Sequence, residues 1–198
     1  MRVAILTHTG DAYVPELVAD RVRALGHDVT RIDTDRFPAR ASLTCTSDGR
    51  ALWRDDAAGG VGEVDLVRVD ALWCRRVYVG VDVLEPYRAL AIDQARAAID
   101  GVLLALCSLD DDVGPRILNH PQRERAAENK LAQMRAARSV GLAMPRTLVS
   151  NDADEVRALA RDHALVVKAL AAPASRAPST HAPPLVTSAL DDGDLADI

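Results

Sequence analysis

Two lysines are the residues of this sequence best suited to chemistry. Lys130 lies in the segment Ala127–Gln133, at the head of a predicted helix, and Lys168 ends the apolar run Ala164–Val167. Lysine carries a compact charge on a flexible stem, so it reaches phosphate oxygens without a fixed bidentate geometry. The first lysine lies on a helix, a break follows at Gly141–Pro145, and the second lysine ends a strand. This order predicts that the two ammonium groups bind one phosphate chain.

A pair of arginines forms a second candidate site, for a substrate or a partner. Arg75 and Arg76 follow the predicted strand Val69–Cys74. Ligands of open parallel sheets bind outside the carboxyl ends of the strands, so this pair is placed to hold a carboxylate or an acidic segment of a partner. The equally weighted alternative is an ion pair within the molecule, with Asp33, Asp35 or Asp70.

The elements that position these arginines begin at the N-terminus. Val3–Thr7 is apolar on both faces, as in a parallel sheet, and a helix that ends at Gly26 separates it from a second strand at Asp28–Asp33. This is a βαβ unit. His8 and Asp11 lie in the loop after the first strand. They either line the crevice of the arginines or belong to a loop that caps the helix, and the second alternative is favoured. No GxGxxG follows that strand, so the dinucleotide fingerprint is absent.

Further elements alternate between strand and helix patterns. In the first part we predict a hairpin around Asp48–Gly49, a loop over Asp56–Gly62, a helix over Pro86–Leu106 and a short strand at Arg116–Asn119. Four residues of the long helix are expected to face the core: Leu90, Ala97, Ile99 and Leu103. In the last part we predict a helix from Gln122 to Gly141, strands at Thr147–Val149, Leu165–Leu170 and Leu185–Ser188, and a helix capped by Asp152 with Glu155 in a capping box.

Composition narrows the class of protein. The 198 residues are 48% apolar and 27% charged, as in a globular protein, and the net charge of −5 argues against general nucleic-acid binding. Cys45, Cys74 and Cys107 have no zinc spacing and indicate reduced thiols. No apolar run is long enough for a signal peptide or a membrane span, so a cytoplasmic protein is expected. Asp110–Asp112 is interpreted as a solvated turn, and no metal ligand or catalytic residue is predicted.

Three phrases of the first 119 residues carry a resemblance to a known family. Ile5–His8, Arg31–Pro38 and Leu72–Arg76, in this order and spacing, resemble the pre-ATP-grasp domain of microviridin-type peptide maturases, or graspetide synthetases. These are ATP-grasp enzymes that crosslink ribosomal peptides. The resemblance continues at the junction to the ATP-grasp small lobe. It is carried there by the segment Asn119–Lys130 and then by Gln133, Gly141, Pro145, Thr147 and Lys168.

The resemblance implies an α/β fold in three parts. Residues 1–119 would form a Rossmann-like parallel-sheet pre-ATP-grasp domain, and residues 120–170 a partial ATP-grasp small lobe. The Ala/Pro-rich and acidic tail, residues 171–198, is expected to be poorly ordered. Nothing after Lys168 resembles the central and C-terminal lobes that supply the adenine pocket and the Mg²⁺ ligands. We therefore expect an N-terminal portion, a fragment or a natural short form, that is inactive alone.

The resemblance also implies a reaction. ATP phosphorylates a side-chain carboxylate, and a hydroxyl or amine then attacks the acyl phosphate to give an ester or amide crosslink. Lys130 and Lys168 would contact the ATP phosphates; ATP and Mg²⁺ belong to the complete enzyme and need not bind this chain alone. The expected partners are a precursor peptide and a second copy joined through the N-terminal domain. The alternative is a non-catalytic module for dimerisation or for binding a peptide or partner.

Overall fold

The computed structural model describes residues 1–56, 59–80, 82, 86–110, 113–168, 170, 187–191 and 193–194. The chain divides into two compact units. The first unit is built on Met1–Glu124, and the second begins at Arg125. No helix among the described residues is long and apolar enough to cross a membrane.

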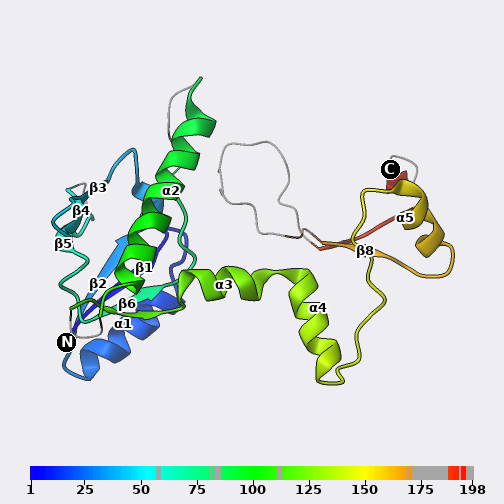
Figure 1. Cartoon of the computed structure of the whole chain (residues 1–198), viewed down its shortest axis with the longest axis horizontal. Helices are drawn as coiled ribbons and strands as arrows, with labels where there is room; N and C mark the ends of the chain where they lie inside the picture. Colours follow the sequence, from blue (N-terminus) through cyan, green and yellow to red (C-terminus); the bar gives the residue numbers. More distant parts are fainter. Residues whose placement is uncertain are drawn as a thin grey trace. The chain divides into compact units, whose positions relative to one another are not determined.

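A four-stranded parallel sheet organises the first unit, as the apolar strand patterns predicted (Figure 1). Its order is β2-β1-β6-β7, and all three neighbouring pairs are parallel. The strands are β1 (Arg2–Thr7), β2 (Asp28–Asp33), β6 (Ala71–Cys74) and β7 (Arg116–Leu118). Ile5 of β1, Ile32 of β2 and Leu72 of β6 are fully buried, so the middle of the sheet is covered on both faces.

Two helices connect these strands in opposite directions across the sheet. Helix α1 (Val14–Ala24) joins β1 to β2, and α2 (Arg88–Cys107) lies between β6 and β7 in the chain. Since parallel connections are right-handed, crossovers that run in opposite directions place their helices on opposite faces. The direction of winding therefore changes between β1 and β6. In open α/β sheets this switch point is where ligands bind, outside the carboxyl ends of the strands.

The inward face of α2 differs in part from the one predicted. Helix α2 buries a stripe at helical spacing: Ala95, Ile99, Leu103 and Leu106. Leu90 is 60% exposed and Ala97 is also exposed, because neither position falls on that stripe. Helix α1 buries Pro15 and Ala19.

The end of α1 is the predicted glycine stop. Gly26 has φ +80 and its N–H donates to the carbonyl of Arg23 at 2.9 Å, while the N–H of His27 donates to the carbonyl of Val22 at 3.3 Å. These two bonds form a Schellman motif.

A small antiparallel sheet is inserted between β2 and β6. It consists of β3 (Ser42–Cys45), β4 (Ala51–Asp55) and β5 (Gly62–Asp65), and the β3–β4 hairpin turns at the predicted Asp48–Gly49. Strand β5 was not predicted, because its short sequence holds few apolar residues. Trp53 of β4 is 2% exposed and packs with Phe37 at 6.0 Å between ring centroids, so it belongs to the core.

Two helices replace the one predicted over Gln122–Gly141, and the helix predicted after Asp152 is present. They are α3 (Pro121–Glu128), α4 (Lys130–Ser139) and α5 (Ala153–Ala160), and a two-residue strand β8 (Val166–Val167) pairs with β9 (Ser188–Ala189). The break is at Asn129, which is extended and whose Oδ1 accepts from the N–H of Ala132 at 3.0 Å. An N-cap of this kind begins a new helix.

Two predicted strands and one capping box need correction. Residues 147–149 form no strand, and β8 covers only two residues of the predicted Leu165–Leu170, because short apolar runs need paired neighbours to form a sheet. Asp152 caps α5 as predicted, accepting from the N–H groups of Asp154 and Glu155. The reciprocal bond is replaced: the N–H of Asp152 donates to Ser150 Oγ at 2.9 Å.

Two other predictions fall partly outside the described residues. Asp111 and Asp112 lie there, but the carbonyl of Asp110 accepts from the N–H groups of Val113 and Gly114, which is a turn. Leu185 and Val186 of the predicted last strand also lie outside the described residues.

Two of the three thiols, Cys45 and Cys74, should differ sharply in reactivity. Burial, with smaller contributions from Glu124 and Cys107, raises the pKa of Cys74 to about 12, while Cys45 is exposed. Because the thiolate is the nucleophile, iodoacetamide at about pH 8 should label Cys45 first and spare Cys74 until the chain is unfolded in urea. Mass spectrometry of the labelled peptides measures the order. Equal labelling of Cys45 and Cys74 in the folded protein would contradict the described core.

Candidate functional site

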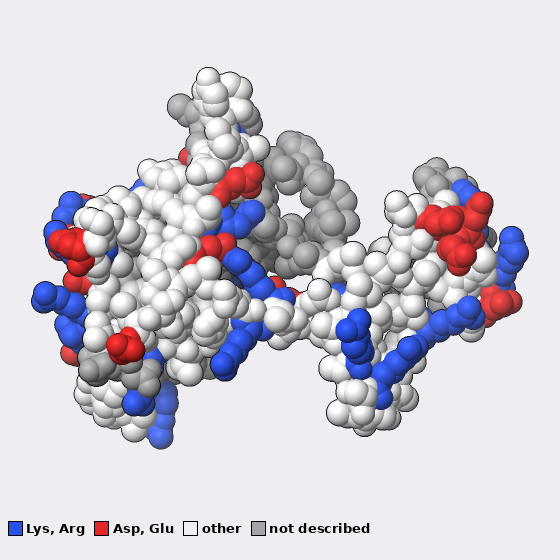
Figure 2. All heavy atoms as spheres, viewed as in Figure 1, with Lys and Arg blue, Asp and Glu red and all other residues white. Residues whose placement is uncertain are grey.

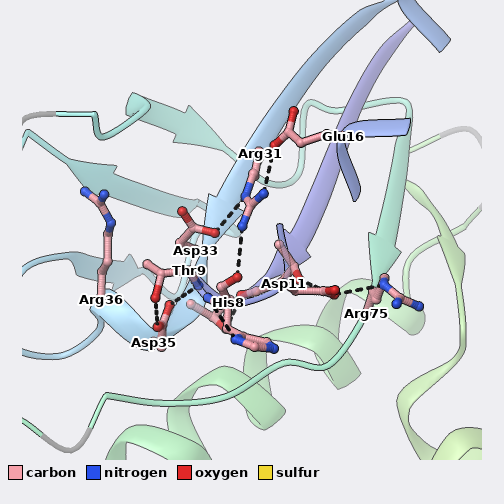
Figure 3. A network of polar contacts seen from close by, with 12 residues as sticks. His8, Thr9, Asp11, Glu16, Arg31, Asp33, Asp35, Arg36 and Arg75 are labelled. Atoms are coloured by element: carbon pink, nitrogen blue, oxygen red, sulfur yellow. Dashed lines mark hydrogen bonds and ion pairs between the residues drawn. The ribbon is translucent and has the colours of Figure 1, made fainter. Parts of the chain in front are cut away.

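The carboxyl ends of β1 and β6 carry a buried carboxylate with three polar neighbours (Figure 3). Asp11 is 6% exposed, and its Oδ2 accepts from Thr7 Oγ1 at 3.0 Å and from Arg75 Nε at 2.9 Å. Arg76 Nη1 lies 3.8 Å from the other oxygen, Oδ1. The guanidinium of Arg75 also lies over the ring of Trp73, 5.7 Å from its centroid. Asp11 thus ties the loop after β1 to the end of β6, at the switch point of the sheet.

The charge of Asp11 is stabilised in the folded protein. Burial alone raises the pKa of this carboxyl, but the hydrogen bonds from Thr7 and Arg75 and the charges of Arg75 and Arg76 outweigh it. The pKa of Asp11 is therefore below its usual range. Asp11 remains ionised at neutral pH, where it holds the two arginines rather than acting as a proton donor.

A second ion cluster holds the same loop from the side of β2. Arg31 Nε bonds to Asp33 Oδ1 and its Nη1 bonds to Glu16 Oε1, both at 2.8 Å. Its Nη2 donates to the carbonyl of His8 at 2.9 Å. These carboxylates raise the pKa of Arg31 against the opposing effect of burial. One guanidinium therefore joins β2, α1 and the loop after β1.

Buried polar groups complete the edge of the sheet. Thr34 is fully buried; its Oγ1 donates to the carbonyl of Thr7 at 2.8 Å and accepts from the N–H of Tyr78 at 3.1 Å. His8 is 7% exposed, and its Nδ1 accepts from the N–H of Gly10 at 3.2 Å. In the neutral ring this bond assigns the proton to Nε2. The loop after β1 is thus fixed by backbone and side-chain bonds together.

The structure brings Arg75 and Arg76 together with Asp11 rather than with the acids proposed from the sequence. The alternative of an ion pair within the molecule applies to Arg75 and, at the longer distance of 3.8 Å, to Arg76, but the suggested partners were wrong. Those acids have other neighbours: Asp33 pairs with Arg31, Asp35 accepts from Thr9, and Asp70 accepts from the N–H of Arg2. The sequence placed Asp11 in the crevice of the arginines as one of two alternatives, and the bond from Arg75 agrees with it. The favoured alternative, a loop that caps the helix, was wrong for these side chains, because Tyr13 is the N-cap of α1 and, among the described residues, no side chain caps it.

The two candidate lysines lie in the second unit, at element boundaries. Lys130 is the first residue of α4, directly after the Asn129 cap, and its Nζ lies 3.3 Å from Gln133 Oε1. Lys168 is exposed and follows β8. They are the only lysines in the sequence; the other 22 of its 24 Lys and Arg residues are arginine. That both ammonium groups bind one phosphate chain stays a prediction.

The side-chain contact of Lys130 is with an uncharged group. Lys130 bonds to a neutral amide oxygen, so its positive charge is not cancelled by that bond. Within the described ranges, no group of three His, Cys, Asp or Glu side chains is placed to hold a metal ion. In the view of Figure 2 the first unit shows basic and acidic side chains interspersed, with no large basic face.

Comparison with known proteins defines the class. Residues 2–113 match the model of the MvdD pre-ATP-grasp domain. The chain is similar to macrocyclase MdnC bound with precursor peptide MdnA, from Microcystis aeruginosa MRC, with a TM-score of 0.78 and 26% identity. That match covers 100% of this chain and 61% of MdnC. This chain therefore spans about three fifths of the length of that relative.

Two further solved structures agree. Macrocyclase MdnB from Microcystis aeruginosa MRC matches with a TM-score of 0.70 and 25% identity, covering 96% of this chain and 61% of MdnB. ATP-grasp ligase PsnB, complexed with a phosphomimetic variant of its minimal precursor, Mg and ADP, matches with a TM-score of 0.60 and 26% identity, covering 98% and 59%. No curated protein matches the chain. The chain belongs to the MvdD pre-ATP-grasp family, and its fold is that of the N-terminal part of ATP-grasp peptide ligases.

Replacing the buried carboxylate tests the site's architecture. Asp11→Asn should lower the free energy of unfolding at pH 7 by about 1–3 kcal/mol, because Arg75 loses a charged acceptor. Since the folded pKa of Asp11 is depressed, its stabilisation is present above about pH 4 and is lost as pH falls through the folded value. The difference between the two proteins in urea denaturation should therefore shrink below about pH 4.

A matched control is Asp20→Asn, which removes an exposed ion pair with Arg23. Exposed pairs contribute little, so this variant should stay within about 0.5 kcal/mol of the parent protein. Equal effects of the two substitutions at pH 7 would contradict a buried, stabilising role for Asp11.

Proposed function

We propose that this chain is the N-terminal portion of an ATP-dependent peptide-modifying ligase. The observation that carries the proposal is the pre-ATP-grasp match over residues 2–113, in a chain whose whole length aligns with a macrocyclase bound to its precursor peptide. The reaction joins a side-chain carboxylate of a precursor peptide to a hydroxyl or amine of the same peptide. The product is an ester or amide crosslink.

The chemistry of that class proceeds in two balanced steps. A carboxylate oxygen attacks the γ-phosphorus of ATP, and ADP leaves, so the carboxyl becomes an acyl phosphate. A hydroxyl or amine then attacks the acyl carbon, phosphate leaves, and the nucleophile gives up its proton. Phosphoryl transfer is catalysed mainly by positioning and by offsetting charge on the phosphate oxygens. Mg²⁺, when bound by the complete enzyme, contributes to that offset.

The role assigned to this chain is phosphate binding by Lys130 and Lys168. Of the 24 Lys and Arg residues in the sequence, only these two are lysine. Lysine differs from arginine in carrying a compact charge on a flexible side chain, which can follow a phosphate group as it moves. Lys130 is positioned by the Asn129 cap and by Gln133, whose Nε2 donates to the carbonyl of Ala127 at 2.6 Å. These bonds support a fixed place for its ammonium group at the helix start.

Calorimetry with Mg·ATP tests the proposal. Whatever affinity the 198-residue chain shows at millimolar nucleotide or below should fall by about tenfold or more in the double substitution Lys130→Ala, Lys168→Ala, because two charged phosphate contacts are lost. Arg138→Ala, on the exposed part of α4, is the control for a general loss of charge. Unchanged affinity in the lysine variant would reject the phosphate assignment.

Absence of heat from the parent chain would favour the second candidate, a module that dimerises or binds a peptide without catalysis. Sedimentation of the same chain then separates the two forms of that alternative. A dimer would support assembly through the first unit, and a monomer would leave peptide binding.

A further inference from the structure

Backbone strain gathers at the carboxyl edge of the parallel sheet. Among the described non-glycine residues, only Arg76 and Asn119 have positive φ, at 51° and 60°. Arg76 lies two residues beyond β6 and Asn119 directly follows β7, so both stand at the ends of neighbouring strands. Asparagine tolerates this conformation, and its Nδ2 here donates to the carbonyl of Cys74 at 3.1 Å. Arginine rarely adopts a positive φ, because its side chain does not compensate for the steric cost. Backbone strain of this kind is concentrated at ligand sites.

The two arginines at this edge differ in how they are held. Arg75 is committed to Asp11, at 2.9 Å, and lies over Trp73. The side chain of Arg76 is 58% exposed, and its Nη1 lies at the longer distance of 3.8 Å from Asp11 Oδ1. Two guanidinium groups therefore share one carboxylate, which leaves local positive charge on the side of β6.

The acids on the β2 side of the edge are paired elsewhere. On the β2 side of the edge, Asp33 and Glu16 bind Arg31, and Asp35 accepts from the N–H and Oγ1 of Thr9. Strand β1 separates β2 from β6, so these pairs and Arg76 belong to opposite sides of the central strand. Arg76 thus presents planar N–H donors at the switch point, where open parallel sheets bind ligands.

We propose that Arg76 binds a carboxylate of an acidic peptide segment at the switch point between β1 and β6. The inference rests on the proposed function, because the ligand is then an aspartate or glutamate side chain of the precursor peptide. Asp11 and Arg75 act as positioning residues: their ion pair occupies one guanidinium and holds the Arg76 backbone at the strand end. A guanidinium suits this ligand because it matches a carboxylate bidentately.

A pair of synthetic peptides tests the proposal on the full chain. One fluorescein-labelled peptide is rich in glutamate and aspartate, and its control replaces each acid by glutamine or asparagine. The acidic peptide should bind more tightly in fluorescence anisotropy, and Arg76→Gln should weaken it by about tenfold, the effect of one charged hydrogen-bonding pair. Arg21→Gln, an exposed arginine on α1, should leave binding unchanged.

The outcomes separate this inference from the proposed function. Mg·ATP binding should be the same in Arg76→Gln as in the parent chain, since the lysines are intact. Equal binding of the two peptides, or equal loss in Arg76→Gln and Arg21→Gln, would overturn the carboxylate site while leaving ATP binding untouched. Displacement of the acidic peptide by inorganic phosphate at lower concentration than by free glutamate would overturn the choice of ligand. Loss of ATP binding in the lysine variant alone bears on the ligase proposal and not on Arg76.

Discussion

The buried ion pair between Asp11 and Arg75 is the constraint on which the edge of the first unit depends. It joins the loop after β1 to the end of β6, two strands that are adjacent in the sheet but separated by more than sixty residues in the chain. A pair of this kind adds little net stability over apolar packing, yet removing the charge of Asp11 leaves Arg75 without its charged acceptor, at a cost of about 1–3 kcal/mol. The main effect of the pair is geometric, because it fixes the position of Arg76 at the switch point.

Charge is used in two ways in this protein. Arginines hold carboxylates within the fold: Arg31 binds Asp33 and Glu16, and Arg36 binds the buried Asp55 at 3.1 Å. A planar fork is suited to such fixed pairs. The two lysines stand apart from this pattern, since Lys130 bonds to a neutral amide. The division matches the proposed roles, with arginine for fixed carboxylates and lysine for phosphates.

The two units are stabilised differently. The first has an apolar core in which α2 and the parallel sheet share buried residues. In the second, helices α4 and α5 have 10 and 8 residues and bury none of them, while Leu131 and Leu142 are more than half exposed. Helices this short are marginal on their own. The caps at Asn129 and Asp152 therefore carry much of the local order, including the position of Lys130.

Local patterns in the sequence determined the alternation of strands and helices, the glycine stop at Gly26, the Asp48–Gly49 turn and the Asp152 cap, because each depends on neighbours within a few residues. The phrases around Ile5, Ile32 and Trp73 were enough to identify the family. Only the tertiary structure decided that Arg75 pairs with Asp11, that Leu90 faces outward and that Thr147–Val149 forms no strand. Those outcomes depend on which residues meet across the sheet, and pairing between distant segments is not encoded in the spacing of either one.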